Sequence, residues 1–517
     1  MRTQSILLLT QEELTLAQLH NFFTADALVS LDIDGKDRVQ RARLVIDSIL
    51  DGDRPVYGVN TGLGKLADIR IPRDHANELQ RRLILSHAAG IGTPMPIDIV
   101  RLMIILKLKA LGQGYSGCRW ELLELLTNML NSGVIPVVPI KGSVGASGDM
   151  APLAHMALTM IGEGKTWRQT AHGWQMVSAQ TALAEAGLEP IMLEAKEGLA
   201  IINGTQAMTA YLVWTLLKAR YLLKTADIVG AISLEALLGT LTAYDQRIHA
   251  LRPHPGQRAV ASNIRRILSE SPMVASHRDT DHKVQDAYSL RCIPQVHGAV
   301  RDALTYINGV VEREINAVTD NPLVFSATGD VLSGGNFHGA PIAMAADYLA
   351  IVLTDLASIA ERRIAHLLDT EMSALPRFLT PDSGLNSGFM IAQVTAAALV
   401  SENKVLSHPA SVDSIPTSAN QEDHVSMGTH AARKAWEIFR NLEYVLAIEL
   451  LSSVQALDLR SPLTPSAATK AVHDLVRKRI PFWEEDRLMH RDIDTARSLI
   501  RQGQVVEAAE SICGPLD

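Results

Sequence analysis

Apolar residues recur at helical spacing along much of the chain, and the longest such stretches lie after residue 200. The ranges 206–238, 299–317 and 341–368 are strongly apolar, and their few charged residues are scattered. A shorter stretch at 97–111 has the same character. Apolar segments of this length and spacing predict buried α-helices. We therefore expect a mainly all-α protein built around a bundle of long helices.

Residues 1–200 show a different pattern, in which short helical segments near 37–50 and 79–85 alternate with loops rich in glycine and proline. We expect two parts: a smaller mixed N-terminal region, 1–200, and a long-helix bundle, 201–517. The composition agrees with this fold class, because 47% of the residues are hydrophobic but only 4% are aromatic. The abundant alanine and leucine favour helices over β-sandwiches.

Charge and cysteine content narrow the class of protein. The net charge of -8 is spread along the chain without acidic or basic blocks, which argues against a nucleic-acid-binding surface. The apolar run 6–9 is too short for a signal-peptide core, and the longest apolar region carries Asp347, Glu361 and Arg363, so we expect no membrane span. Three cysteines without paired spacing are typical of a reduced, cytoplasmic protein.

A tight turn with the sequence Gly-Ser-Val-Gly-Ala-Ser-Gly-Asp occupies residues 142–149 and precedes a predicted helix. Asp149 suits the N-cap of that helix and Pro152 its first turn. One interpretation is an anion site at the helix N-terminus. The turn matches neither phosphate-binding glycine motif, and Pro136 and Pro139 disfavour a central strand before it. This interpretation is therefore weak.

The other interpretation of the turn is chemical. In Ala146-Ser147-Gly148 the glycine nitrogen can approach the carbonyl carbon two residues earlier, because glycine has no side chain to obstruct ring closure. Loss of water from that ring and from Ser147 would leave a methylidene group on an imidazolone, which is an electrophile. Ser147 would then be the source of the electrophile and not a hydroxyl nucleophile.

Four further segments accompany the turn: the Tyr57 loop 56–64, the segment 284–298, the glycine-rich loop 333–339, and 418–428 with its Gln-Glu-Asp-His run. Over about residues 50–460 the chain resembles the aromatic amino acid ammonia-lyases. The resemblance implies the ammonia-lyase and fumarase-like architecture and a 4-methylidene-imidazol-5-one formed autocatalytically from Ala146, Ser147 and Gly148, with no external cofactor. It also implies a homotetramer whose active sites draw residues from three subunits.

The resemblance gives a role to each matching residue. The expected catalytic residues are Tyr57, Tyr288, Phe337 and Glu422. The expected substrate-binding residues are His87, Asn203, Gln285, Arg291 and Glu422. In these roles Arg291 would hold the substrate carboxylate, Tyr288 would take the β-proton and Tyr57 would assist proton transfer around the amine.

The residues by themselves support some of these roles and leave others open. Gln285, Tyr288 and Arg291 are three residues apart, so a helical turn would place them on one face. An arginine there suits a carboxylate. The Tyr57 loop alone would be a structural turn, and His87 alone would be a helix C-cap.

Two ring-facing residues indicate the substrate. A phenyl ring would leave His87 and Glu422 unpaired at a cost of roughly 1–3 kcal/mol each, whereas an imidazole can pair with both. The resemblance thus points to L-histidine, released as trans-urocanate and ammonia. Tyrosine-specific members often have Gln in place of Glu422. Many histidine-specific members have Phe where this chain has Leu63, which leaves the shape of the pocket open.

Three alternatives remain at this point. A tyrosine ammonia-lyase or an aromatic 2,3-aminomutase would use the same cofactor. A non-catalytic helical scaffold would lack the Ala-Ser-Gly turn, Tyr57, Tyr288 or Arg291, all of which are intact.

The run His277-Arg278-Asp279-Thr280-Asp281-His282 could suggest a metal site, but a solvated polar loop is the better interpretation, and we expect no metal.

Overall fold

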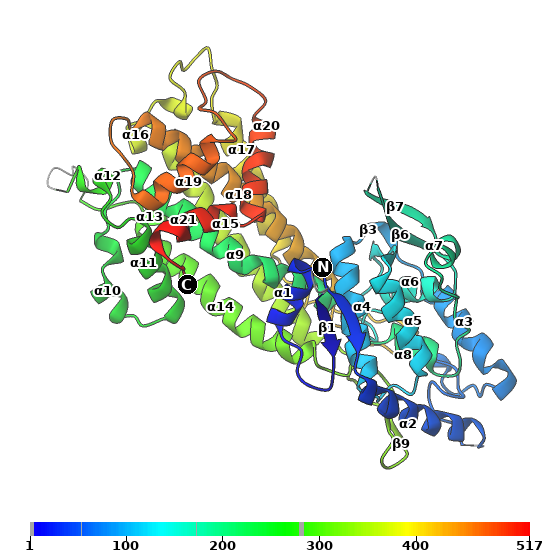
Figure 1. Cartoon of the computed structure of the whole chain (residues 1–517). Helices are drawn as coiled ribbons and strands as arrows, with labels where there is room; N and C mark the ends of the chain where they lie inside the picture. The colour runs from blue at the N-terminus through cyan, green and yellow to red at the C-terminus, as the bar shows by residue number, and fades with distance from the viewer. Residues whose placement is uncertain (1–4, 53, 172, 279–283) are drawn as a thin grey trace. The chain divides into compact units, whose positions relative to one another are not determined.

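A computed structural model describes residues 5–52, 54–171, 173–278 and 284–517, and Figure 1 labels its elements. The protein is mainly α-helical with a few short strands, which confirms the predicted fold class. Two compact units can be distinguished. Unit 1 comprises 1–217, 308–347 and 409–433, and unit 2 comprises 218–307, 348–408 and 434–517. The two-part division at residue 200 stays a prediction.

Four of the five boundaries between the units fall within the long helices α9 (Gln206–Ala236), α14 (Ile293–Glu314), α15 (Ala340–Leu368) and α18 (Gly428–Leu459), and the fifth, between 408 and 409, follows α17 (Met390–Leu406). The bounds of α9, α14 and α15 lie close to the predicted apolar ranges, whereas α18 was not predicted. α15 has the length and composition of a membrane-crossing helix, but 61% of its most apolar 18-residue segment is buried inside the protein. Arg363 on α15 is fully buried and pairs with the equally buried Glu449 of α18. α15 is therefore a core helix.

Unit 1 combines short helices with small sheets. Its helices and 3-10 turns are α1 (Leu16–Thr24), α2 (Ile33–Leu50), η1 (Gly64–Leu66), η2 (Arg73–His75), α3 (Ala76–His87), α4 (Ile97–Gly112), α5 (Trp120–Asn131), α6 (Met150–Met160), α7 (Ala179–Glu185) and α8 (Glu197–Ile202). Its strands are β1 (Ile6–Leu9), β2 (Leu28–Leu31), β3 (Ile91–Pro94), β4 (Val134–Pro136), β5 (Pro139–Lys141), β6 (Lys165–Thr170), β7 (Gly173–Ser178), β8 (Leu323–Phe325) and β9 (Asp330–Leu332).

The strands of unit 1 form separate small sheets. β1 pairs with β2 in parallel, and β3 with β5, and β8 with β9, pair antiparallel. The antiparallel sheet of β4, β6 and β7 has β4 at its edge. Pro136 ends β4 and Pro139 begins β5, which is where proline is tolerated in strands. The two prolines thus exclude a central strand, as predicted.

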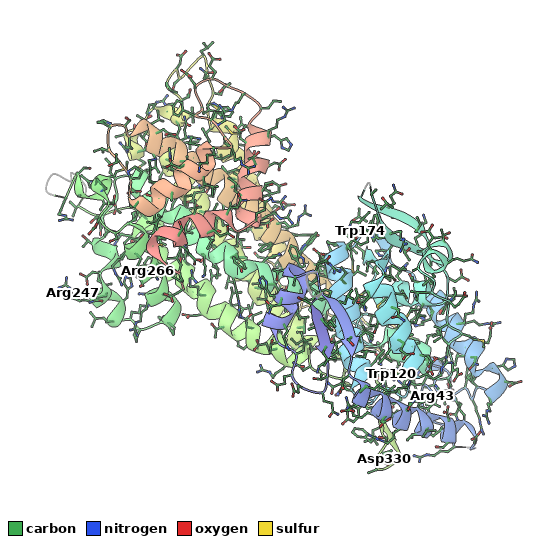
Figure 2. The ribbon with its side chains drawn as sticks, in the orientation of Figure 1. Arg43, Trp120, Trp174, Arg247, Arg266 and Asp330 are labelled. Atoms are coloured by element: carbon green, nitrogen blue, oxygen red, sulfur yellow. The ribbon has the colours of Figure 1, made fainter. Side chains whose placement is uncertain are left out.

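Helices α3, α6 and α8 contact one another, and α4 packs on α2 and α5. α4 is buried on nearly all sides, as its apolar sequence predicts. Arg43 of α2 fixes the segment that leads into α8, because it pairs with Glu194 at 2.8 Å and donates to the carbonyl of Ala195 at 3.0 Å. Figure 2 labels Arg43 on α2 and Trp120 at the start of α5.

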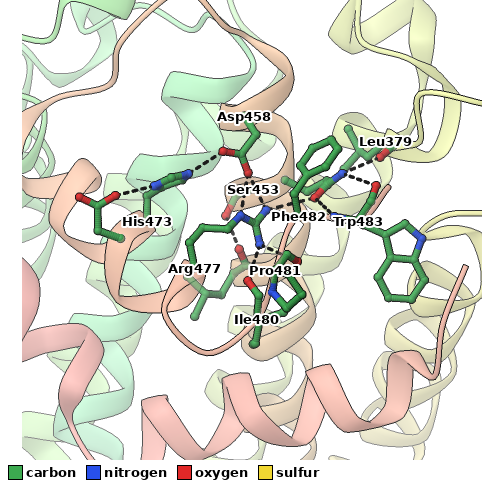
Figure 3. Close-up of polar contacts among 12 residues, drawn as sticks. Leu379, Ser453, Asp458, His473, Arg477, Ile480, Pro481, Phe482 and Trp483 are labelled. Atoms are coloured by element: carbon green, nitrogen blue, oxygen red, sulfur yellow. Dashed lines mark hydrogen bonds and ion pairs between the residues drawn. The ribbon is translucent and has the colours of Figure 1, made fainter. Parts of the chain in front are cut away.

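Unit 2 is helical in the part of it that the structure describes. Besides its share of the long helices it contains η3 (Thr242–Tyr244), α10 (Gln246–Ala250), α11 (Pro255–Ile267), α12 (Pro272–Ala275), α13 (Tyr288–Arg291), α16 (Thr370–Ser373), η4 (Arg377–Leu379), α17 (Met390–Leu406), α19 (Ala467–Arg477), α20 (Met489–Arg501) and α21 (Gln504–Cys513). Figure 3 shows a polar cluster that joins α18 to α19. Asp458 accepts hydrogen bonds from His473 at 2.7 Å and Arg477 at 2.8 Å, and the first of these raises the pKa of His473.

Candidate active site

A cavity of about 450 Å³ lies within unit 1. Six residues predicted for the site line it: Tyr57, Ala146, Ser147, Asn203, Phe337 and Glu422. They come from loops and helix ends that are up to several hundred residues apart in the chain. The fold therefore brings together most of the predicted cofactor turn with residues from four other segments.

The turn at the cavity has an unusual backbone. Ser147 has φ +51°, and Gly145 and Gly148 have φ +79° and +77°. A non-glycine residue in this region costs on the order of 1–3 kcal/mol. The Gly148 amide donates to the Gly145 carbonyl at 3.2 Å, and a side chain at Gly148 would collide with the Gly204 carbonyl at 2.2 Å. The turn is thus tightly folded back on itself, with glycine required at 148.

Asp149 occupies the N-cap position of α6, as predicted, but its carboxylate does not cap that helix. It accepts from the amide of Met208 at 2.9 Å, in the first turn of α9, and from the hydroxyl of Thr429. Burial raises the pKa of Asp149 to about 6, although these hydrogen bonds oppose the rise. Asp149 is therefore the N-cap residue that the sequence predicted, while its carboxylate binds α9 and α18.

Tyr57 lies at the cavity in a loop closed by its own side chain. The Gly64 amide donates to the Tyr57 hydroxyl at 3.2 Å. Gly58 has φ +72°, and an added Cβ would lie 2.5 Å from Leu199. Leu63 packs near Gly58 and does not line the cavity among the described residues. Leu63 is therefore part of the packing of the Tyr57 loop.

Glu422 links the cavity wall to the turn. Its Oε1 accepts from the Ser147 hydroxyl at 3.1 Å and its Oε2 from the Thr417 hydroxyl at 2.8 Å. Backbone hydrogen bonds between Thr417 and Glu422 run in both directions and close this loop. Thr417 was not identified from the sequence. Its position only five residues before Glu422 was the one feature of the sequence that could have indicated a contact between them.

His87 is the last residue of α3 and is half-buried. Its Nδ1 lies 2.9 Å from the carbonyl oxygen of Leu83, which can only accept. A neutral His87 therefore has its proton on Nδ1 and keeps Nε2 as an acceptor. Burial lowers the pKa of His87, and the negative charge of Glu422 acts in the opposite direction. His87 is not among the described residues that line the cavity.

The side-chain amide of Asn203 is fixed by buried hydrogen bonds. Its Nδ2 donates to Asp320 at 3.2 Å and to the Asn321 carbonyl at 3.0 Å, and Lys196 pairs with Asp320 at 2.8 Å. The Asn203 Oδ1 is buried and has no hydrogen-bond partner among the described residues. A buried acceptor at a cavity wall fits a ligand that brings an N–H group.

Phe337 and His338 belong to the loop that precedes α15. The His338 ring stacks on that of His424, with centroids 5.9 Å apart and planes at 4°. The His338 Nε2 also lies 3.2 Å from the His424 carbonyl. Both histidines line the cavity, and sequence reasoning assigned neither to the site.

Gln285, Tyr288 and Arg291 belong to unit 2 and are not among the described residues that line this cavity. Tyr288 and Arg291 share the single turn α13, with the Arg291 guanidinium 4.5 Å from the Tyr288 ring centroid. Gln285 lies outside the helix, because α13 begins at Tyr288 and the residue before it, Ala287, has an extended backbone with ψ 156°. The predicted shared face is therefore confirmed for two residues and wrong for Gln285.

The possible metal ligands at 277–282 lie mostly outside the described residues, which omit 279–283. Among the described residues no group of three or more His, Cys, Asp or Glu side chains could hold a metal ion.

A mainly helical fold with an Ala-Ser-Gly turn at a polar cavity agrees with a carbon–nitrogen lyase of the aromatic amino acid type, the class to which the matching family and relatives belong. The chain belongs to the aromatic amino acid lyase family, whose sequence model matches residues 14–478. A histidine ammonia-lyase of Anaeromyxobacter sp. (strain K) is 52% identical over 501 residues, which are 96% of this chain and 99% of that protein.

Two solved structures show the same likeness. The histidine ammonia-lyase of Trypanosoma cruzi has a TM-score of 0.89 and 43% identity, covering 98% of this chain and 95% of that one. The tyrosine aminomutase of Streptomyces globisporus has a TM-score of 0.91 and 36% identity, covering 99% of both chains. The fold is thus common to lyases and mutases, and the site residues must decide the reaction.

Proposed function

We propose that the protein deaminates L-histidine without oxidation, releasing trans-urocanate and ammonia. The relatives that share about half of its sequence over nearly its full length are histidine ammonia-lyases. The observation that carries the proposal is Glu422 at the cavity, whose carboxylate accepts from the Ser147 hydroxyl at 3.1 Å. A hydrogen-bond acceptor for an imidazole thus lies next to the residue that would form the electrophile.

The turn fits the self-formed cofactor proposed for it. The left-handed Ser147, the unsubstituted Gly148 and the unpartnered Asn203 Oδ1 supply a folded backbone and an acceptor at the same wall. Once Ala146, Ser147 and Gly148 are cyclised and dehydrated, they supply an electrophile that makes the substrate amine a better leaving group. The residues that would hold this group are Gly145, Asn203 and Gly204.

Glu422 and His87 would favour histidine over phenylalanine. The Glu422 carboxylate and His87 Nε2 both accept hydrogen bonds, and burying either against a phenyl ring would leave an acceptor unpaired at a cost of about 1–3 kcal/mol. A neutral imidazole can donate its one N–H to one of these acceptors, and a protonated imidazole can donate to both. Tyrosine deamination and the aminomutase reaction are less well supported, because the relatives at about 50% identity are histidine ammonia-lyases.

Arg291 and Tyr288 complete the proposal: Arg291 would hold the substrate carboxylate, and Tyr288 would accept the β-proton. Because these residues and Gln285 are absent from the described lining of the cavity, we propose that other copies of the chain supply them. A homotetramer with shared active sites meets this requirement. The three cysteines are free thiols, which supports a cytoplasmic location.

Replacing Glu422 by glutamine tests the substrate assignment. We expect Glu422→Gln to lower kcat/KM for L-histidine roughly 10- to 100-fold, the range of a lost charge-assisted hydrogen bond. Activity on L-tyrosine should fall less, because a phenol stays neutral, whereas an imidazole can carry a positive charge next to the carboxylate. The measurement is steady-state kinetics on both amino acids.

Asp423→Asn is the matched control, because Asp423 lines the same cavity and the variant removes the same charge. It should leave the ratio of histidine to tyrosine activity nearly unchanged. Equal losses on both substrates in Glu422→Gln would contradict the role of Glu422 in choosing histidine.

A further inference from the structure

Lys107 is a buried lysine that contacts the peptide next to the active-site turn. It lies on α4, is 1% exposed, and donates to the carbonyl of Asn203 at 2.6 Å and to that of Ala200 at 3.3 Å. These carbonyls are at the C-terminal end of α8, where a positive charge is favourable. Burying a lysine is costly unless its nitrogen donates hydrogen bonds to buried acceptors or pairs with a charge. The position of Lys107 thus calls for an explanation beyond packing.

The carbonyl that Lys107 holds belongs to a peptide unit that contacts the turn. In the peptide between Asn203 and Gly204, the C=O accepts from Lys107 and the N–H donates to the carbonyl of Ser147 at 3.4 Å. The next carbonyl, that of Gly204, accepts from the amide of Asp149 at 2.7 Å. One peptide therefore connects the Lys107 nitrogen to the residue that forms the electrophile.

The same contact fixes the Asn203 side chain. Lys107 restrains the Asn203 backbone, while Asp320 and Asn321 restrain its amide group. Together they set where the unpartnered Asn203 Oδ1 lies. Hydrogen bonds in series polarise one another in a medium of low dielectric constant, so a donor on the Asn203 carbonyl also strengthens the Gly204 N–H as a donor to Ser147.

We propose that Lys107 is a positioning residue for the deamination, acting through the Asn203–Gly204 peptide to hold both the Ala146–Gly148 turn and the Asn203 side chain in working geometry. The proposal rests on the proposed function, since it takes the turn and Asn203 as parts of the active site.

The charged groups around Lys107 agree with a fixed polar support. Burial lowers the pKa of Lys107 to about 7, which the negative charges of Asp320 and Asp149 oppose and the positive charge of Lys196 reinforces. An ammonium and a neutral amine both carry N–H donors for the two carbonyls. Lys107 can therefore hold the peptide in either protonation state.

Helix α4 offers a matched control two residues further on. Lys109 is 3% exposed and donates to the carbonyls of Thr10 and Glu12 at 2.8 and 2.6 Å, away from the turn. Lys107→Met and Lys109→Met each remove a buried nitrogen that donates to two backbone carbonyls. They differ in one respect: only the Asn203 carbonyl, which loses its donor in Lys107→Met, belongs to a peptide that contacts the turn.

The experiment compares both variants with the wild type by thermal unfolding, by intact mass and by kinetics on L-histidine. Intact mass shows what fraction of chains has lost the two waters of cofactor formation. We expect similar losses of Tm in both variants. Only Lys107→Met should show incomplete water loss or a kcat per dehydrated chain that is roughly 10- to 100-fold lower.

A Lys107→Met variant with complete water loss and wild-type kcat and KM would overturn the proposal. If this variant does not fold, Lys107→Leu, which also removes the N–H donors, takes its place under the same criteria. Aggregation of both Lys107 variants beside a soluble Lys109→Met would also count against the proposal, because Lys107 would then be a residue of the core. A failure of the proposed function would appear in the wild type itself, as absent water loss or absent urocanate.

Discussion

Ser147→Ala is expected to abolish the deamination, with kcat on L-histidine at least about 10³-fold below the wild type, because only the positioning and acid–base residues would remain. The Ala variant has no hydroxyl to leave from the turn, so no methylidene group can form. Intact mass should therefore show that the mass deficit of the dehydrated wild type is lost. Kinetics and mass are measured on the same preparation.

Ser48→Ala serves as the control for Ser147→Ala. Ser48 is on α2, and its hydroxyl donates to the Val45 carbonyl in its own helix at 2.8 Å. This variant should keep both the mass deficit and the activity. A Ser147→Ala protein that still deaminates histidine at a comparable rate would exclude an electrophile derived from Ser147.

Tyr288→Phe is expected to have the second largest effect, a fall in kcat of roughly 10²- to 10⁴-fold, the usual contribution of a general base. Tyr288 is 72% exposed, and its ring is held against the Arg291 guanidinium at 4.5 Å. The phenylalanine ring keeps this contact, so Arg291 should remain available to the carboxylate. KM for L-histidine should therefore change far less than kcat.

The control for Tyr288→Phe is Tyr306→Phe, since Tyr306 is another exposed tyrosine of unit 2 and lies on α14 against the ring of Tyr348. Its kcat should match that of the wild type. The water loss measured by intact mass should be complete in both variants, because neither tyrosine belongs to the turn. A Tyr288→Phe variant with wild-type kcat would exclude Tyr288 as the base.

The sequence predicted most of what depends on local pattern. Helix α4 was expected at 97–111 and spans Ile97–Gly112, and α15 was expected at 341–368 and spans Ala340–Leu368. The glycine spacing of the turn at 142–149 predicted a tight backbone, and Gly145 and Gly148 do have positive φ. Periodicity and the conformational freedom of glycine are properties of a few neighbouring residues, so they can be read from the sequence.

Contacts between distant segments could not be predicted in this way. The Asp149 carboxylate caps α9 and not α6, because residues 204–208 are folded against the turn. Lys107 contacts Asn203 from 96 positions away, and nothing in the apolar pattern of α4 distinguished it from Lys109. Gln285 left the expected helical face because α13 is only four residues long. Each of these outcomes depends on tertiary packing rather than on local spacing.

The most direct test of histidine deamination is to supply the wild-type protein separately with L-histidine, L-tyrosine and L-phenylalanine and to follow each unsaturated product by its absorbance. We expect urocanate from L-histidine, with kcat/KM at least about 100-fold above that for either other amino acid. A preference for L-tyrosine, or a β-amino acid as the main product, would contradict the assignment of His87 and Glu422 to an imidazole.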